Sequence, residues 1–229
     1  MPGIERMLFK KEGEDMDTSA QGKAIKGVVF DFDGVLFDSL DSNLAYYNRV
    51  FRAMGAPEVT LADKEKVRIC HTASSPGVFD ALLGEEQREA ALAYARQLDF
   101  HDFIPLMRLM PDVIPALRRL RERVKLAVAT NRDKSTLGIL QYFKMEEYFQ
   151  AIVTLRDVHR PKPDPEMLFL AAQRLELDVS EMIYVGDALS DRLAAEAAGM
   201  RFVDYRGTAG GGIRLMSHLA LPLLVEEKI

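Results

Sequence analysis

Hydrophobic and polar positions along the chain follow two alternating patterns. Short runs of branched and aromatic residues predict buried strands, and apolar residues spaced three or four apart predict helices between them. The expected strands are 28–30, 125–130, 151–155, 182–185 and 201–205. A helix is expected before each of the last four strands, at 113–123, 135–143, 165–175 and 191–198. Such alternation indicates the α/β class, with a Rossmann-like parallel sheet covered by helices on both faces.

Residues 40–109 interrupt the alternation, because they carry helical patterns and no credible strand. The first of these helices is expected to be capped by Asp41 or Ser42 and stopped by Gly55. The other helices are expected at 61–69, 78–83 and 85–98, with a polar loop at 71–76.

The resulting domain organisation is an α/β core, formed by 23–39 and 110–229, with residues 40–109 inserted as an all-helical cap. Ligands of parallel sheets bind outside the carboxyl ends of the strands, so an insertion that leaves from the first strand emerges where a lid would sit. Residues 1–22 contain few apolar residues in a row and are expected to be a disordered extension.

Two carboxylates, Asp31 and Asp33, follow the first expected strand, and Gly34 comes next. The side chains of residues two apart in an extended chain point the same way. Two ionised carboxylates that lie so close together usually share a cation. Gly34 lets the backbone turn and brings amide N–H groups near a bound anion. A carboxylate nucleophile, an adjacent acid/base and a hard metal ion suit phosphoryl transfer. The alternative is a strand that ends in an acidic turn.

Three more strand ends carry polar residues that would complement this chemistry. Thr130 and Asn131 can donate hydrogen bonds to phosphoryl oxygens, and Lys162 between two prolines can neutralise charge. Asp187 and Asp191 add oxygen ligands, which favour Mg²⁺ over softer metals. Each has a plainer explanation as a helix cap, a solvated turn lysine or compensation of a helix dipole. All of them fall at one predicted edge, which favours a common site.

Four motifs at these positions, DFDGVLFDS, VAT-N, RPKPDP and VGDALSD, together resemble the haloacid dehalogenase (HAD) superfamily of phosphohydrolases. The resemblance runs from about residue 24 to 205, and the layout with its helical cap is most similar to the phosphoglycolate phosphatase-like branch. It implies that Asp31 attacks phosphorus to form an aspartyl-phosphate. It also implies that Asp33 protonates the leaving alcohol and then activates water.

The same resemblance implies the remaining roles. Thr130 and the backbone N–H of Asn131 would hold the phosphoryl group, and Lys162 would orient and neutralise it. Mg²⁺ would bind Asp31, the backbone carbonyl of Asp33 and Asp187, with Asp191 adjacent or contacting the ion through water. The substrate would be a small soluble phosphomonoester.

This chain departs from the family pattern in two places. Ala188 replaces the Ser or Thr that usually follows the fourth-motif aspartate, and Asp112 replaces a glycine after Pro111. The histidine that is usual in the cap of β-phosphoglucomutase-like members is absent from 40–47, which makes a mutase the less favoured alternative. A pyrophosphatase and a non-catalytic binding protein also remain open.

Within the cap, Arg68 could bind a second anionic group of the substrate, although a surface salt bridge is the favoured interpretation. The glycine-rich stretch 207–212 lacks the Lys-Ser/Thr ending of a phosphate loop and is expected to be a flexible loop.

Composition limits the kinds of partner that the chain is expected to bind and the compartment in which it is expected to work. The net charge of −5 argues against a general nucleic-acid binder, and no apolar run reaches the ~20 residues that a membrane span needs. The single cysteine, Cys70, excludes an intrachain disulfide and suits a reducing compartment, so a cytoplasmic location is expected. Oligomeric state is not readable from the sequence.

Overall fold

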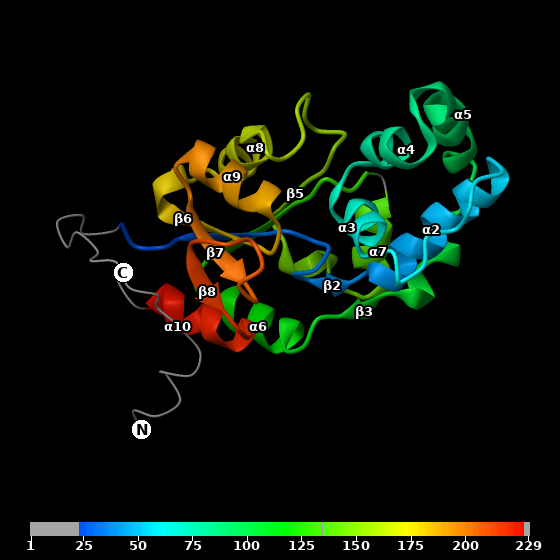
Figure 1. Ribbon diagram of the computed structural model, residues 1–229. Coiled ribbons are helices and arrows are strands. Elements are labelled where there is room, and N and C mark those ends of the chain that lie inside the picture. Colours follow the sequence, from blue (N-terminus) through cyan, green and yellow to red (C-terminus); the bar gives the residue numbers. More distant parts are fainter. Residues whose placement is uncertain (1–22, 134, 227–229) are drawn as a thin grey trace. The chain divides into compact units, whose positions relative to one another are not determined.

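A six-stranded parallel sheet forms the centre of one of the two compact units of the chain (Figure 1). The computed structural model describes residues 23–133 and 135–226, so the extension expected at 1–22 lies outside the described residues. The strands are β1 (Gly27–Phe30), β4 (Lys125–Ala129), β5 (Ala151–Val153), β6 (Met182–Gly186), β7 (Arg201–Tyr205) and β8 (Ile213–Leu215). Their order is β5-β4-β1-β6-β7-β8.

Strand β1 occupies the middle of this sheet. All four of its residues are buried, as expected for a Gly-Val-Val-Phe run that is covered on both faces. Phe30 lies opposite Val128 of β4 on one side and Val185 of β6 on the other. The chain order therefore reverses at β1, and the residues that follow Phe30 emerge at the switch point of the sheet, where such folds bind ligands.

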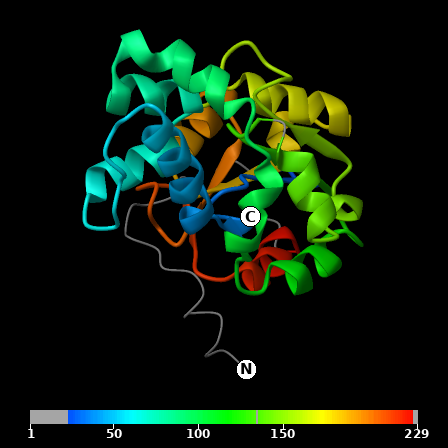
Figure 2. The same cartoon turned by 90° about the vertical axis from the view of Figure 1, so that its right-hand side faces the viewer.

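Helices cover both faces of the sheet. Figures 1 and 2 show α8 (Glu166–Leu175) on the opposite face from α6 (Val113–Leu120) and α10 (Leu221–Glu226). The other helices of this unit are α7 (Ser135–Tyr142), η3 (Glu146–Tyr148), η4 (Val179–Glu181), α9 (Leu189–Ala198) and η5 (His218–Ala220). Met167 and Leu168 of α8 pack with Val29 of β1 in one buried cluster. The predicted α/β class with a parallel sheet is confirmed.

The second compact unit is Phe37–Leu109, inserted between Leu36 and Met110 of the first. Its helices are α2 (Leu40–Ala53), α3 (Lys64–Thr72), α4 (Ser75–Leu83), α5 (Glu85–Ala95), η1 (Phe100–Asp102) and η2 (Ile104–Leu106). It has a hydrophobic core of its own, in which the rings of Tyr47 and Phe51 from α2 pack against Phe79 from α4.

Several boundaries in this second unit differ from the sequence-based expectation. Helix α2 starts at Leu40, so Asp41 and Ser42 lie inside the helix and neither caps it. The polar stretch expected to be a loop at 71–76 is mostly helical, because α3 extends through Thr72 and α4 begins at Ser75. Polar residues in a short amphipathic helix look the same as a loop when periodicity is the only guide.

Strands were missed where they are very short. Phe37–Asp38 (β2) and Arg108–Leu109 (β3) pair antiparallel, so the expectation that 40–109 contains no strand is wrong at its end. Strand β8 follows the glycine-rich stretch and adds to β7 in parallel. Pairs of two or three residues show no alternation of their own, and only the partner strand makes them strands. Within the described part of the chain, no helix is long and apolar enough to span a membrane.

Candidate active site

Side chains that follow three strands meet at the carboxyl edge of the sheet. Asp31 follows β1, Lys162 follows β5, and Asp187 follows β6, with Asp191 on the first turn of α9. The Lys162 ammonium lies 2.6 Å from Asp31 Oδ1 and 2.7 Å from Asp191 Oδ1. Carboxylate oxygens of Asp31, Asp187 and Asp191 lie within 4.8 Å of one another. The structure therefore brings together four of the residues that the sequence singled out, Asp31, Lys162, Asp187 and Asp191.

Lys162 is the buried cation of this cluster. Besides the two carboxylates, its ammonium contacts the Tyr184 hydroxyl at 2.8 Å and the Ala129 carbonyl at 3.2 Å. The Asn131 side chain holds the Lys162 backbone from both sides, since its amide donates to the Lys162 carbonyl (3.0 Å) and its oxygen accepts the Lys162 N–H (2.9 Å). Sequence reasoning expected Asn131 to donate to a phosphoryl oxygen or to cap a helix, and it missed this contact.

Asp191 anchors the cluster to α9. Its Oδ1 accepts hydrogen bonds from Lys162 and from the Tyr184 hydroxyl (2.9 Å), and its Oδ2 accepts the backbone N–H groups of Asp187 (3.2 Å) and Ala188 (3.0 Å). Burial and the charge of Asp191 raise the pKa of Tyr184 well above its usual value, so the hydroxyl stays protonated and can donate. Both oxygens of Asp191 are thus engaged by protein donors, and its role as a metal ligand stays a prediction.

Asp31 and Asp187 carry negative charge that the protein compensates incompletely. Burial, and next the charge of Asp191, raises the pKa of Asp31 to about 7, although Lys162 opposes the shift. Burial, and next the charge of Asp31, raises the pKa of Asp187 to about 8. A buried and a half-buried carboxylate, both with raised pKa values and with oxygen atoms close to one another, form an environment in which a cation is strongly favoured.

The charge count of the site agrees with a divalent ion. Four carboxylates, Asp31, Asp33, Asp187 and Asp191, are paired with two cations, Lys162 and Arg132, which leaves two negative charges when all are ionised. The ligand atoms are all hard oxygens, a set that fits Mg²⁺ better than a softer metal.

Gly34 gives the turn after β1 the space that this arrangement needs. Its φ is +79°, a backbone conformation that residues other than glycine rarely adopt. A Cβ at this position would lie 2.1 Å from Asp187 Oδ2, well inside van der Waals contact. The glycine therefore permits the close approach of the first and fourth motifs, whereas the sequence had indicated only a turn and an exposed amide.

Thr130 lies directly after β4 and is buried. Its Oγ1 accepts the backbone N–H of Arg132 at 3.1 Å, so the hydroxyl proton can be donated to another acceptor. A hydroxyl with its proton available is suited to binding a phosphoryl oxygen.

Arg132 belongs to the site, and sequence reasoning missed it. Its Nε donates to Asp33 Oδ2 (3.1 Å) and its Nη2 to Asp33 Oδ1 (2.7 Å), a bidentate pair between the turn after β1 and the turn after β4. A signal was present, because Arg132 is the residue that follows the Thr-Asn motif at the same sheet edge. Tyr184 was missed for another reason, since an aromatic residue within a buried strand looks like core packing.

The two departures from the family pattern are accommodated locally. Beside Ala188, the hydroxyl of Thr208 from the glycine-rich stretch donates to the Asp187 carbonyl at 2.6 Å. That stretch is a loop, as expected, and the buried Asp204 carboxylate holds it by accepting the backbone N–H groups of Ala209 and Gly210 at 3.1 and 3.0 Å. Asp112 has a left-handed φ of 63°, the conformation that a glycine would adopt with less strain.

Arg68 lies on α3 in the second unit, and its guanidinium pairs with Glu65 at 2.6 Å on an exposed surface. This is the surface salt bridge that the sequence favoured, and a role of Arg68 in substrate binding stays a prediction.

The chain is similar to a known hydrolase family and to several named phosphatases. The family model for haloacid dehalogenase-like hydrolases matches residues 28–204. Phosphoglycolate phosphatase 1 of Pseudomonas aeruginosa is 30% identical over 185 residues, which cover 76% of this chain and 66% of that protein, slightly less than two thirds of its length. The phosphorylated carbohydrates phosphatase of Thermotoga maritima is 27% identical over 208 residues, covering 90% of this chain and 96% of that protein.

Solved structures show the same fold. The crystal structure of a HAD-superfamily hydrolase from Geobacter sulfurreducens is 36% identical and superposes with a TM-score of 0.79, covering 88% of this chain and 100% of that one. The family-model match at residues 28–204 spans all four motif regions.

Proposed function

Because the chain belongs to the haloacid dehalogenase-like hydrolase family, we propose that it is a phosphatase that hydrolyses a small phosphomonoester through an aspartyl-phosphate on Asp31. The observation that carries this proposal is the contact between Lys162 and Asp31 at the switch point of the sheet, beside Asp187. Relatives named phosphoglycolate phosphatase and phosphorylated carbohydrates phosphatase support the substrate class. We place the activity in the cytoplasm, which the single cysteine favours.

In the first step, an oxygen of Asp31 attacks phosphorus and the bond between phosphorus and the ester oxygen breaks. Lys162 holds Asp31 Oδ1 at 2.6 Å, which directs the carboxylate and offsets charge on the transferring group. Asp33 gives its proton to the departing oxygen, so that the product leaves as a neutral alcohol. The Thr130 hydroxyl and the backbone N–H of Asn131 bind phosphoryl oxygens.

In the second step, water attacks the phosphorus of the aspartyl-phosphate while Asp33, now ionised, takes a proton from it. The bond between phosphorus and the Asp31 oxygen breaks, which releases inorganic phosphate and restores the carboxylate. Asp31, the Asp33 carbonyl and Asp187 would hold Mg²⁺, with Asp191 beside them. The ion supplies positive charge that allows an anionic nucleophile and an anionic substrate to approach.

The residues of the core account for recognition of the phosphoryl group and leave the alcohol portion of the substrate undetermined. We propose that the inserted helical unit, Phe37–Leu109, selects among esters as a cap. A substrate panel is therefore the most informative first experiment.

We expect the purified chain to release inorganic phosphate from p-nitrophenyl phosphate and from at least one small phosphomonoester in the presence of Mg²⁺, because the nucleophile, the acid/base and the lysine are all present at the sheet edge. Phosphate release would be measured on a panel that includes phosphoglycolate, sugar phosphates, nucleotides and pyrophosphate. Absence of turnover on every ester, with Mg²⁺ binding verified by calorimetry, would favour a non-catalytic binding protein.

A second expectation concerns the stability of the metal-free protein, which should fall as pH rises from about 5 to 8.5. The folded-state pKa values of Asp31 (about 7) and Asp187 (about 8) lie above the unfolded value of about 3.9, so the folded state binds more protons across this window. Each kcal/mol lost lowers the Tm by about 2–4 °C in a chain of this size. Added Mg²⁺ should raise the Tm more at pH 8 than at pH 5.5.

The matched variant for this measurement is Asp187→Asn, which removes one of the two raised pKa values. It should flatten the pH profile and reduce the response to Mg²⁺. A response to Mg²⁺ as large as that of the parent would contradict the assignment of Asp187 as a ligand.

A further inference from the structure

Arg132 is a charged residue of the site to which the mechanism above gives no task. Its guanidinium donates to both oxygens of Asp33, at 3.1 and 2.7 Å, across 99 positions of sequence. Both side chains are largely withdrawn from solvent, with exposed fractions of 16% and 18%. An ion pair of this geometry, partly buried and bidentate, has a fixed direction that exposed single-contact pairs lack.

Arg132 is itself held in place. Its backbone N–H donates to Thr130 Oγ1 at 3.1 Å, and its carbonyl accepts the N–H of Leu155 at 3.2 Å. Its guanidinium carbon lies 5.6 Å from the centre of the Phe32 ring, which is fully buried. These contacts fix both ends of the residue. The guanidinium is therefore held with two N–H donors, Nε and Nη2, directed at Asp33 as a planar fork.

Asp33 benefits from such a fork because of its position in the chain. It lies past the last residue of β1, in a single β-bridge next to the turn at Gly34, beyond the ladder that pairs β1 with β4 and β6. A carboxyl group has two lone pairs on each oxygen, and the fork uses one on each. The fork therefore fixes the plane of the carboxyl group.

We propose that Arg132 is a positioning residue that aims the Asp33 carboxyl group at the leaving oxygen of the substrate and at the attacking water. This inference rests on the proposed function, because only an acid/base at Asp33 needs such aim. Lysine can reproduce the role only in part, since a single ammonium lacks the planar pair of donors.

Leaving groups of different acidity separate this role from a structural one. A poorly acidic alcohol needs a proton from Asp33 as its bond to phosphorus breaks, whereas p-nitrophenolate is stable without one. The value of kcat/KM reports the steps up to release of that leaving group. If the Asp33 carboxyl group is no longer correctly oriented, kcat/KM should therefore fall much more for an alkyl phosphate than for p-nitrophenyl phosphate.

The experiment compares Arg132→Met and Arg132→Lys with the parent on p-nitrophenyl phosphate and on the best alkyl phosphate of the panel, at saturating Mg²⁺. For Arg132→Met we expect kcat/KM to fall by about 10- to 100-fold on the alkyl phosphate and by less than about threefold on the aryl one. Arg132→Lys should show the same contrast to a smaller degree. It also carries the test if Arg132→Met fails to fold.

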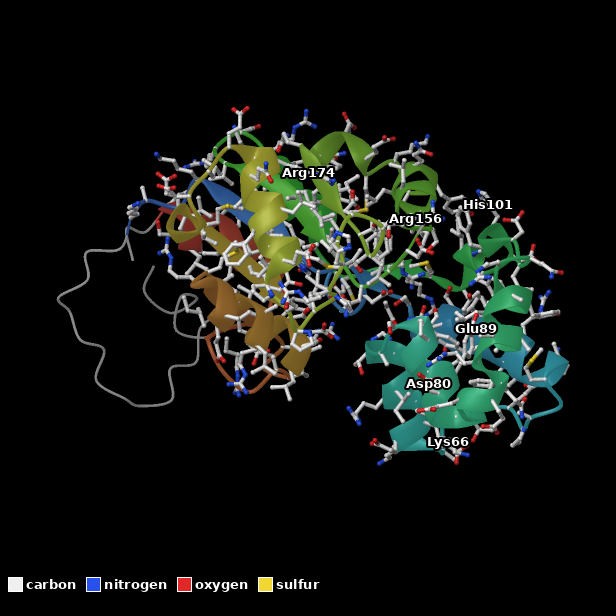
Figure 3. The ribbon with its side chains drawn as sticks, turned by 90° about the horizontal axis from the view of Figure 1, so that it is seen from above. Lys66, Asp80, Glu89, His101, Arg156 and Arg174 are labelled. Carbon is white, nitrogen blue, oxygen red and sulfur yellow. The ribbon has the colours of Figure 1, made fainter. Side chains whose placement is uncertain are left out.

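Two further variants complete the design. Arg156→Met removes a neighbouring arginine that pairs with Asp133 on the surface of the core, where the Arg156 side chain is 64% exposed (Figure 3). This variant should leave kcat/KM unchanged for both esters. Asp33→Asn should show the same leaving-group contrast as Arg132→Met, only larger, and adding Arg132→Met to it should cause little further loss.

Equal losses of Arg132→Met on both esters, or no loss on the alkyl phosphate, would overturn the inference while leaving the proposed function intact. Absence of parent turnover on every ester would instead overturn the proposed function, and the inference with it. The two failures are thus distinguished by the parent alone.

Discussion

Replacement of Asp31 by asparagine should abolish turnover, with a loss of at least about 10⁴-fold in kcat, because the amide is a very poor nucleophile toward phosphorus. Folding should not suffer. Burial and neighbouring charge raise the pKa of Asp31 to about 7, which means that its ionised form is unfavourable in the metal-free fold. A neutral amide of the same shape removes that cost, and Lys162 keeps Asp191 as a partner. Phosphate release and the Tm of the metal-free protein would be measured side by side.

The control for this variant is Asp133→Asn. Asp133 is an exposed carboxylate of the same unit, with a side chain that is 55% exposed and pairs with Arg156. It should retain parental turnover and a free energy of unfolding within about 0.5 kcal/mol of the parent. Turnover near the parental level in Asp31→Asn would remove Asp31 as the nucleophile, whatever the behaviour of the control.

Replacement of Lys162 by methionine should damage both stability and activity. The ammonium is buried and pairs with Asp31 and Asp191, so its removal leaves two buried carboxylates without their cation. Breaking a buried pair in this way typically costs about 3–5 kcal/mol. At about 2–4 °C for each kcal/mol, the Tm should fall by roughly 10 °C near neutral pH. Turnover should be lost as well, because the charge that directs Asp31 is gone.

The pH dependence of this variant identifies the cause. Lys162 opposes the raised pKa of Asp31, so without it the folded-state pKa rises further above the unfolded value. The folded variant then binds more protons than the unfolded chain above about pH 4, and its stability falls as pH rises. The Tm difference from the parent should therefore be smaller at pH 5 than at pH 8. A difference that is constant with pH would point to lost packing in place of unpaired charge.

Lys26→Met is the matched control for that experiment. Lys26 pairs with Glu181 at the opposite end of β1, and its side chain is 58% exposed. Exposed pairs contribute about 0–1 kcal/mol, so the control should shift the Tm by little and should not touch turnover.

The sequence by itself determined which chain segments end at the ligand edge. Val28–Phe30 is a strand because of its own residues, and Asp31 follows it in the printed order. The Pro-Lys-Pro triplet around Lys162 and the Gly-Asp pair ending at Asp187 are equally local. Strand and helix periodicity is a property of neighbouring residues, so an α/β core with Asp31, Lys162 and Asp187 at one edge could be inferred without coordinates.

Only the tertiary structure decided which partners these residues have. Asp33 and Arg132 meet because β1 and β4 are adjacent strands, and Tyr184 reaches Lys162 because β6 lies on the other side of β1. Strand order and side-chain direction join residues that are far apart in the sequence, and no local pattern records such a pair. A hydrogen bond between distant segments depends on how the whole sheet assembles, which is why Asp31, Lys162 and Asp187 were readable from the sequence and their partners Arg132 and Tyr184 were not.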